Sequence, residues 1–293
     1  MTFEEQVTDF PLERRSMMKP IENQTIMITG VTDGLGKKVA LDLADRKAGV
    51  IIHGRNPRKG EAVVKEIREA TGNPKITYYN ADFSALDEVR MLAGKIRADQ
   101  GRLDVLINNA GIGPGPDGSV REESKDGYEL RFAVNYLATF LLTHRLLPLL
   151  RDSAPSRIVN VASAGQQSID FDDVMLESGY DGLRAYRQSK LAMILFTFDL
   201  AAQLKDSGIT ANCLHPATLM PTNMVLETDY FSGSIDAVSQ GAEAVEYLAE
   251  SAALDGVTGA YFNGKTRAEP MPQASDPQAQ RKLRELSRKL TRL

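Results

Sequence analysis

The sequence predicts an α/β fold in which a single, doubly wound, parallel sheet is covered by helices on both faces. Two observations predict it. Short apolar runs alternate with longer amphipathic segments over most of the 293 residues, and no internal repeat interrupts the alternation. The composition, with 42% hydrophobic and 25% charged residues, is that of an ordinary globular domain. Strands buried on both faces read as continuous apolar runs, and a single sheet of this kind commonly reaches this length.

The elements follow in the order strand, helix, strand, helix. Predicted strands cover 26–28, 50–52, 76–79, 105–107, 158–161 and 210–214. Predicted helices comprise one that ends near residue 46 and four over 57–70, 85–98, 129–150 and 183–205. Residues 1–23 are polar, contain Pro11 and Pro20 and lack periodicity, so we expect an N-terminal arm over 1–23 and a single domain over 24–293.

Charge and cysteine content exclude several classes of function. The formal net charge of -4 gives no sign of a nucleic-acid-binding protein. The single cysteine, Cys213, has no partner for an internal disulfide, and the acidic first residues do not resemble a secretory signal. No run reaches the roughly 20 apolar residues that span a bilayer. We therefore expect a cytoplasmic protein without a membrane span. The three histidines are too scattered to predict a metal site.

A glycine-rich turn follows the first strand and opens the first helix. It reads Thr29-Gly30-Val31-Thr32-Asp33-Gly34-Leu35-Gly36. Glycine lets the backbone approach a pyrophosphate closely, while the N–H groups and the positive end of the helix attract the anion. An ATP-type phosphate loop is excluded, because it would need Gly at Leu35 followed by Lys and then Ser or Thr. The turn alone leaves open a tight strand–helix connection without a ligand.

The turn resembles the TGxxxGxG fingerprint of the short-chain dehydrogenase/reductase family, and further matches follow in the family's order. They are Asp82 after the third strand, Asn108-Asn109-Ala110-Gly111 after the fourth, then Asn135, Ser163 and Tyr186-x-x-x-Lys190. The resemblance covers residues 25–264 and implies a Rossmann fold that moves a hydride between a nicotinamide and a carbonyl or alcohol carbon. A long insert between Ser163 and Tyr186 resembles the retinol-dehydrogenase-like branch and related bacterial ketoreductases.

The resemblance also implies which residues bind the cofactor. They are Thr29, Gly30, Thr32, Asp33, Gly34, Leu35, Gly36, Arg55, Asn56, Asp82, Phe83, Asn109, Ala110, Gly111, Tyr186, Lys190, Pro216 and Thr218. Asp82 matches the acid used on the adenine ring, although it is also suited to cap the next helix, and Asn109 is suited to serve the turn alone. Ala217 replaces a family glycine, and Thr222 lies near Thr218, so which threonine contacts the carboxamide stays open.

The end of the second predicted strand bears on the choice of nicotinamide. A carboxylate there would bind the ribose 2′-OH and repel a 2′-phosphate, but the position holds Gly54 and is followed by Arg55. Arg55 is suited to pair with the phosphate, and the alternative is an ordinary solvated arginine. Asp33 weakens the prediction, because similar NADP enzymes often carry a basic residue there. We expect NADP(H) rather than NAD(H).

The predicted chemistry rests on Tyr186 and Lys190, which lie four apart on one face of a helix. A phenol has a pKa near 10, and a neighbouring ammonium stabilises its phenolate. The resemblance implies that Tyr186 protonates the substrate oxygen, Ser163 hydrogen-bonds to that oxygen, Lys190 also holds the ribose, and Asn135 anchors a water. A non-catalytic protein that senses the NAD(P) pool is the alternative, and the presence of all four residues argues against it.

Two segments near the C-terminus concern substrate and assembly. Residues 219–235 lie where relatives carry a substrate lid, and the adaptable Met220 and Met224 suit a bulky apolar molecule, although an ordinary packed surface helix fits the pattern equally. The tail over 281–293 carries an apolar stripe, which we expect to dock on the chain's own surface rather than on a membrane or partner. Relatives often pair through helices equivalent to 129–150 and 183–205, so a homodimer or homotetramer is open.

Overall fold

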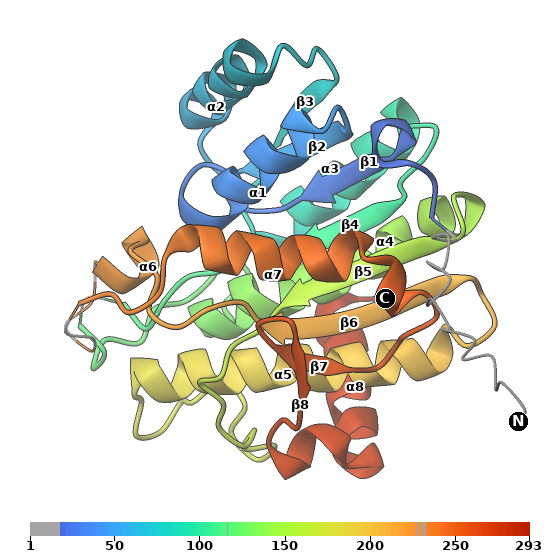
Figure 1. The fold of residues 1–293 in the computed structure, drawn as a ribbon. Helices are drawn as coiled ribbons and strands as arrows, with labels where there is room; N and C mark the ends of the chain where they lie inside the picture. Colours follow the sequence, from blue (N-terminus) through green and yellow to red (C-terminus); the bar gives the residue numbers. More distant parts are fainter. Residues whose placement is uncertain (1–17, 116, 227, 229, 231–232) are drawn as a thin grey trace, which may run out of the picture.

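The structure is a computed structural model, and it describes residues 18–115, 117–226, 228, 230 and 233–293. Its centre is an eight-stranded sheet with the order β3-β2-β1-β4-β5-β6-β7-β8 (Figure 1). The strands are β1 Thr25–Ile28, β2 Gly49–Gly54, β3 Ile76–Asn80, β4 Val105–Asn108, β5 Ser156–Val161, β6 Ile209–His215, β7 Tyr261–Asn263 and β8 Thr266–Ala268. All pairings from β3 to β7 are parallel, and only β8 runs antiparallel to β7. The predicted doubly wound sheet is confirmed.

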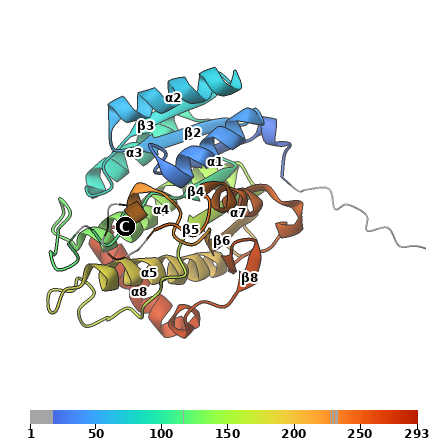
Figure 2. The ribbon, with the colours of Figure 1, turned by 60° about the vertical axis from the view of Figure 1, so that its left-hand side comes forward.

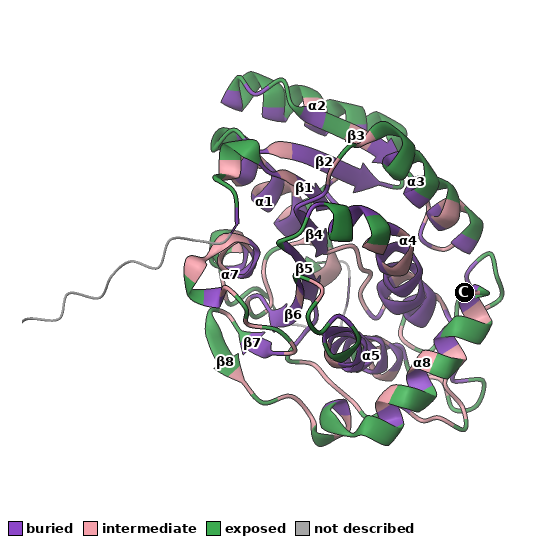
Figure 3. Cartoon of the chain, turned by 90° about the vertical axis from the view of Figure 1, so that its right-hand side faces the viewer, coloured by how far each residue is buried: buried purple, intermediate pink, exposed green. Residues whose placement is uncertain are grey.

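Helices cover both faces of the sheet (Figure 3). They are α1 Gly34–Asp45, α2 Pro57–Thr71, α3 Leu86–Asp99, α4 Ala138–Asp152, α5 Gly182–Gln203, α6 Asn223–Leu226, α7 Val238–Glu250 and α8 Pro277–Thr291. One core cluster joins the sheet to α1, α2 and α7, and a second joins it to α3, α4, α5 and α8. The strand order reverses between β1 and β4, and the carboxyl ends of such strands are where ligands bind in open α/β sheets.

The structure adds elements that the sequence pattern did not predict. Strands β7 and β8 have three residues each, which is too short for a periodic signal, and α7 lies between the lid segment and β7. The predicted helix over 129–150 is confirmed, and it contains a π-helical turn, Phe132–Leu137, that runs into α4. Together they form a run with the length and composition of a membrane span, and 78% of its apolar 18-residue stretch is buried inside the fold.

The predicted N-terminal arm is described only from residue 18, so residues 1–17 lie outside the described part of the chain. Met18 is buried in the core cluster that includes α1. Ile21–Asn23 forms a short 3-10 turn, and Lys75 Nζ donates a hydrogen bond of 2.8 Å to the carbonyl of Glu22. The segment that precedes β1 is thus packed on the domain.

The C-terminal helix α8 docks on the chain's own surface beside α5 (Figures 2 and 3). Its buried side includes Leu283 and Ser287, and the Ser287 hydroxyl hydrogen-bonds to the Tyr136 hydroxyl at 2.7 Å. Arg284 forms an ion pair with Asp199 of α5. The helix therefore covers part of α5, which is equivalent to one of the two helices through which relatives often pair.

Candidate active site

The glycine-rich turn lies at the carboxyl end of β1, and three of its glycines are required by the backbone. Gly30 and Gly34 have φ of 71° and 56°, which disfavours any residue with a side chain. A Cβ atom at Gly30 would lie 2.7 Å from the Ala110 Cα, and one at Gly36 would lie 2.3 Å from the Gly30 carbonyl oxygen. The turn therefore presents bare backbone at the point where β1 and β4 separate.

Helix α1 begins at this turn with an open N-terminus. Its N-cap residue, Asp33, is exposed and makes no capping hydrogen bond from its side chain within the described residues. By contrast, Asn56 caps α2 by accepting a hydrogen bond of 3.1 Å from the Lys59 N–H. Free N–H groups and the positive end of a helix attract an anion. The open end of α1 therefore fits a phosphate, whereas Asn56 already has a structural role in capping.

Thr29 and Asn109 join the turn to the end of β4. The buried Thr29 Oγ1 accepts hydrogen bonds from the N–H groups of Asn109 (3.0 Å) and Ala110 (2.9 Å). In return, Asn109 Nδ2 donates to the carbonyls of Thr29 (2.9 Å) and Gly30 (3.0 Å). The two sequence motifs that were expected to bind the cofactor thus form one hydrogen-bonded unit.

His53 supports the same turn, a role that its local sequence does not reveal. The buried ring accepts a long hydrogen bond from the Gly30 N–H at Nδ1 (3.4 Å), and its Nε2 lies 3.0 Å from the Ala81 carbonyl oxygen. It stacks on the buried Phe83 with ring centroids 4.2 Å apart. Burial lowers the pKa of His53 to about 4, so the ring is neutral and donates from Nε2. Phe83 therefore buttresses the turn through His53.

Asp82 is engaged in the turn that follows β3. Its Oδ1 accepts a hydrogen bond of 2.9 Å from the Ser84 N–H, and its Oδ2 lies 3.2 Å from Lys125 Nζ. Burial raises the pKa of Asp82, but the bonds from Ser84 and Lys125 outweigh it, so the pKa is lowered. The N-cap of α3 is Ala85, so Asp82 forms a local turn and does not cap that helix.

The end of β2 carries an exposed basic group. Arg55 is exposed and, within the described ranges, forms neither a hydrogen bond nor an ion pair. Arg58 and the side chain of Lys59 are likewise exposed and unpaired among the residues that the structure describes. A Cβ atom at Gly54 would lie 2.5 Å from Thr32 Cγ2, so Gly54 also makes room for the turn after β1.

Ser163, Tyr186 and Lys190 meet at the carboxyl end of β5. Tyr186 and Ser163 both border Gly165, where a Cβ atom would lie 3.4 Å from Ser163 Oγ and 3.8 Å from Tyr186 Cε1. Lys190 Nζ lies 5.7 Å from the centroid of the Tyr186 ring. Lys190 is buried, and its ammonium donates a hydrogen bond of 3.1 Å to the Val161 carbonyl. A Cβ atom at Gly111 would lie 3.5 Å from Lys190 Nζ, so the end of β4 borders the same group.

The pKa values differ from the expectation that the ammonium lowers the pKa of the phenol. Burial raises the pKa of Tyr186, and the neighbouring Ser163 side chain opposes that rise. Burial also lowers the pKa of Lys190 to about 8. Both shifts have one cause, since a buried site disfavours the charged form of each group. The proton is thus held on Tyr186 in this structure, as a general acid for carbonyl reduction requires.

Asn135 lies in the π-helical turn, and its side chain is fully engaged. Its Oδ1 accepts a hydrogen bond of 2.7 Å from the Ile112 N–H, and its Nδ2 donates to the Ile112 carbonyl (3.1 Å) and to Ser189 Oγ (2.9 Å). Ser189 in turn donates to the Tyr186 carbonyl at 2.7 Å. Asn135 therefore links the loop after β4 to the helix that carries Tyr186. π-Helical turns occur frequently at functional sites.

The segment after β6 places the two candidate threonines apart. Thr218 is exposed; its Oγ1 lies 3.1 Å from His215 Nε2, and its N–H donates to Asp236 Oδ2 at 2.6 Å. The preceding Pro216 is buried. Thr222 instead lies against the glycine-rich turn, because a Cβ atom at Gly34 would be 2.9 Å from its Cγ2. Thr222 is therefore the threonine nearer the start of α1.

The predicted lid contacts both sides of the site. Met220 lies near Leu35 at the start of α1. A Cβ atom at Gly241 would lie 2.5 Å from Met220 Sδ and 3.3 Å from Leu35 Cδ1. Met224 of α6 lies over the loop after β4, where a Cβ atom at Gly113 would be 3.1 Å from its Cγ. Residues 227, 229, 231 and 232 of the predicted lid lie outside the described residues.

A protein-family comparison decides the family. The model described as short chain dehydrogenase matches residues 24–230. The chain is a short-chain dehydrogenase/reductase. This family of oxidoreductases also accounts for the sheet order and for the order of the sequence motifs.

Curated relatives of this short-chain dehydrogenase/reductase belong largely to the retinol-dehydrogenase-like branch, as the sequence predicted. Retinol dehydrogenase 13 of Mus musculus is 37% identical over 278 residues, which cover 90% of this chain and 82% of the relative. Retinol dehydrogenase 11 of Homo sapiens is 37% identical and covers 91% of this chain and 85% of its own length.

Solved structures show the same fold. An uncharacterised protein of Mycobacterium paratuberculosis has a TM-score of 0.73 and 31% identity, with 92% of this chain and 94% of that chain covered. A short chain dehydrogenase of Escherichia coli, solved with NADPH, has a TM-score of 0.68 and 26% identity over 83% of this chain and 97% of that chain. A 3-ketoacyl-(acyl-carrier-protein) reductase of Brucella melitensis, solved with NADH, has a TM-score of 0.67 and 25% identity over 83% and 97%.

Proposed function

We propose that this short-chain dehydrogenase/reductase uses NADP(H) to interconvert a carbonyl compound and its alcohol, with a bulky apolar substrate. The observation that carries the proposal is that Tyr186 and Ser163 lie together next to Gly165, beside the buried Lys190. These groups lie at the carboxyl ends of the strands, where the open N-terminus of α1 also lies.

The residues present fit a dinucleotide. Positive φ angles and tight contacts keep the turn after β1 free of side chains, which leaves room for a pyrophosphate at the start of α1. The turn 29–36 would hold the pyrophosphate, Asp82 and Phe83 would border the adenine, and Asn109, Ala110, Gly111, Pro216 and Thr218 would border the nicotinamide end. When bound, the nicotinamide supplies or accepts the hydride.

The side chains of this chain handle the proton. Tyr186 donates its proton to the substrate oxygen during reduction and takes it back during oxidation, because burial keeps the phenol protonated. Ser163 donates a hydrogen bond to the same oxygen and stabilises its developing negative charge. Lys190 supplies a positive charge next to the phenol, and Asn135 fixes the loop that borders them.

The preference for NADP(H) rests on Gly54 and Arg55. The end of β2 offers no carboxylate at Gly54 to bind a ribose 2′-OH, and Arg55 is unpaired within the described chain and exposed. A guanidinium binds a phosphate with two parallel hydrogen bonds. The NADPH bound to the Escherichia coli relative is consistent with this choice, whereas the NADH of the Brucella relative means that the family alone does not decide it.

The class of substrate is inferred from the lid and from the relatives. Met220 and Met224 flank the site with flexible, polarizable side chains that adapt to irregular apolar molecules. Two relatives at 37% identity are named retinol dehydrogenase, and retinol is a bulky apolar alcohol. A cytoplasmic location and a dimeric or tetrameric assembly stay predictions.

The test is consumption of NADPH by the purified chain with bulky aromatic ketones, quinones and retinoid aldehydes, repeated with NADH. We expect turnover of at least one apolar carbonyl compound with NADPH, and a much lower kcat/KM with NADH. Tight NADPH binding without turnover of any of these compounds would instead support the NAD(P)-sensing alternative.

A further inference from the structure

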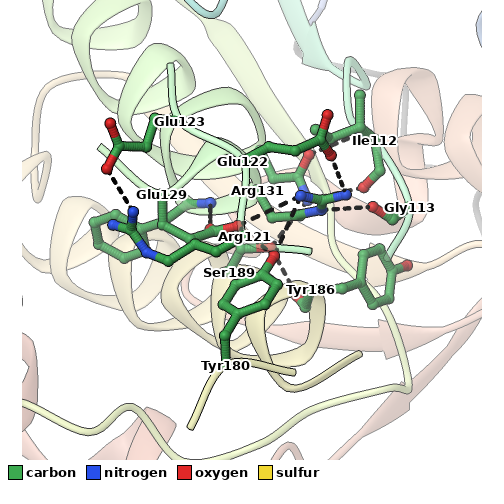
Figure 4. A network of polar contacts seen from close by, with 12 residues as sticks. Ile112, Gly113, Arg121, Glu122, Glu123, Glu129, Arg131, Tyr180, Tyr186 and Ser189 are labelled. Carbon is green, nitrogen blue, oxygen red and sulfur yellow. Dashed lines mark hydrogen bonds and ion pairs between the residues drawn. The ribbon is translucent and has the colours of Figure 1, made fainter. Parts of the chain in front are cut away.

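Arg131 is a buried cation that the proposed chemistry does not use. It precedes the π-helical turn, and only 2% of its side chain is exposed (Figure 4). Its Nε donates to the Gly113 carbonyl at 3.2 Å, its Nη1 to the Tyr180 hydroxyl at 3.2 Å, and its Nη2 to Glu122 Oε2 at 2.7 Å. A guanidinium is tolerated in the interior only when such partners satisfy its donors and its charge.

Glu129 is the second buried charge of this network. Its side chain is 1% exposed; Oε1 accepts a hydrogen bond from the Tyr180 hydroxyl at 3.0 Å, and Oε2 accepts one from the Phe132 N–H at 2.6 Å. Burial raises the pKa of Glu129, and its hydrogen bonds and Arg131 oppose that rise. The Tyr180 hydroxyl therefore accepts from Arg131 and donates to Glu129, so it connects the cation to the carboxylate.

The network holds the loop after β4 at a point next to the catalytic groups. Asn135 binds both the N–H and the carbonyl of Ile112, while Arg131, four residues earlier, binds the carbonyl of Gly113. The loop also wraps around the guanidinium, because a Cβ atom at Gly115 would lie 2.3 Å from Arg131 Nη2. Asn135 and Arg131, two side chains of one helical segment, therefore hydrogen-bond to adjacent peptide groups of the loop after β4.

The loop over residues 112–115 faces the predicted lid. Met224 lies directly over Gly113, where a Cβ atom would be 3.0 Å from the Met224 carbonyl oxygen. Tyr180 comes from the long insert between Ser163 and Tyr186, so the network joins that insert to the loop. A shift of Arg131 would therefore move the surface on which the lid rests without touching the turn that fits the cofactor.

We propose that Arg131, together with Tyr180 and Glu122, is a positioning device that fixes residues 112–115 as the substrate-side wall and so sets the affinity for the carbonyl substrate. This inference rests on the proposed function. It predicts that loosening the network raises the KM for the substrate and leaves NADPH binding unchanged, because Arg131 contacts the loop and the insert but not the glycine-rich turn.

The kinetic test compares Tyr180→Phe and Glu122→Gln with the matched control Glu123→Gln. Glu123 is the next residue along and forms an exposed ion pair with Arg121, so its substitution makes the same chemical change outside the network (Figure 4). We expect the KM for the carbonyl substrate to rise by about tenfold in the first two variants, with kcat within about twofold and the NADPH Kd unchanged. The control should match the wild type.

An unchanged KM in Tyr180→Phe and Glu122→Gln would overturn the proposal, and so would a parallel loss of NADPH affinity, which would indicate a general structural role. Arg131→Lys keeps the charge but not the fork of donors, so we expect it to raise KM as well. Wild-type affinity in Arg131→Lys would contradict the role assigned to the guanidinium geometry.

A second measurement does not depend on catalysis. Amide hydrogen exchange of peptides that span residues 111–118 should be faster in Tyr180→Phe than in the wild type and unchanged in Glu123→Gln. If the wild type reduces no carbonyl compound, the proposed function fails, while the exchange experiment still tests the positioning device. Equal exchange in Tyr180→Phe and the wild type would overturn the device even in an active enzyme.

Discussion

The turn after β1 and the predicted lid lie at the same edge of the sheet as the proposed catalytic groups, and they are held by different contacts. The turn is fixed along its length, because a Cβ atom at Gly36 would meet the Gly30 carbonyl and Asn109 donates to two of its carbonyls. At the base of the predicted lid, the two residues that flank it are joined by hydrogen bonds. There the Thr218 N–H donates to Asp236 Oδ2 (2.6 Å), and the Asp236 N–H donates to the Thr218 carbonyl (3.0 Å).

This difference separates the two tasks of the site. A dinucleotide is a constant ligand, and a turn without room for any side chain suits it. If residues 219–235 form the substrate lid that the sequence predicts, they must open and repack around the substrate. Substitutions in the turn should therefore act strongly on the cofactor, whereas those at the base of the lid should act mildly and mainly on the substrate.

Gly36→Ala should have the largest effect. The added Cβ would lie 2.3 Å from the Gly30 carbonyl oxygen and 2.5 Å from Asn109 Nδ2, and neither atom is free to move. We expect a loss of about 1–3 kcal/mol in the free energy of unfolding and a fall of at least about tenfold in NADPH affinity. Urea unfolding and NADPH titration measure the two effects.

The matched control is Gly94→Ala in α3, where an added Cβ meets nothing within 4 Å. Alanine should stabilise that helix by roughly 0.5–1 kcal/mol and leave NADPH binding unchanged. If Gly36→Ala behaved like Gly94→Ala, the turn would not be fixed in the way that its contacts imply.

Lys190→Met separates stability from function. The ammonium is buried and its pKa is lowered to about 8, so the fold disfavours its charged form. Removing it should raise the free energy of unfolding near neutral pH by on the order of 1–3 kcal/mol, while turnover and NADPH affinity fall. A thermal melt and a cofactor titration on the same preparation test both parts. A lower melting temperature with intact NADPH affinity would contradict the role given to Lys190.

The same shift predicts how the stability of the wild type depends on pH. Between about pH 8 and the unfolded pKa near 10.5, Lys190 is deprotonated in the folded chain and protonated in the unfolded chain. Unfolding then takes up a proton, so this residue makes the wild type more stable as pH rises through that window. Lys190→Met should show a smaller rise over the same range in urea unfolding.

Arg55→Ala tests whether the end of β2 selects NADPH over NADH. A charge-assisted hydrogen bond contributes about 1.5–3 kcal/mol, so NADPH affinity should fall roughly tenfold to a hundredfold while NADH affinity stays within about twofold. Both cofactors are titrated at one fixed salt concentration, because salt screens an exposed pair. An equal loss of affinity for the two cofactors would mean that Arg55 does not bind the 2′-phosphate.

A change of cofactor preference from NADPH to NADH needs two substitutions. Asp at position 54 would supply an acceptor for a 2′-OH, but its Cβ would lie 2.5 Å from Thr32 Cγ2. We therefore expect Gly54→Asp to reverse the cofactor preference only when Thr32→Ser removes that methyl group. Thr32→Ser alone serves as the control and should keep the wild-type preference.

Asp236→Asn should have the smallest effect. It weakens the bond from the Thr218 N–H at the base of the lid but keeps an oxygen acceptor. We expect a rise of about threefold in the substrate KM and no change in NADPH affinity. The nearby exposed ion pair of Glu243 and Lys265 provides the control, Glu243→Gln, which should leave steady-state kinetics unchanged. A larger effect on NADPH affinity than on the substrate KM would mean that the base of the lid acts on the cofactor, as the turn after β1 does.

The two regions also differ in how far the sequence predicted them. The turn after β1 and the Asn109 motif follow strands directly, so their local pattern predicted where they would lie in the sheet. The role of His53 could not be predicted, because nothing in its local sequence shows that Gly30 would donate to its ring. The sequence likewise could not reveal Arg131 and Tyr180 as partners, since they are 49 residues apart and meet only through tertiary packing.

The central claim is that Tyr186 transfers a proton at the substrate oxygen and contributes little to cofactor binding. Turnover of a carbonyl substrate and the NADPH Kd should be measured for the wild type and for Tyr186→Phe, which removes only the hydroxyl group. General acid–base catalysis contributes about 10²- to 10⁴-fold, so kcat should fall by that factor while the NADPH Kd stays within about threefold. Near-wild-type turnover in Tyr186→Phe would contradict the account.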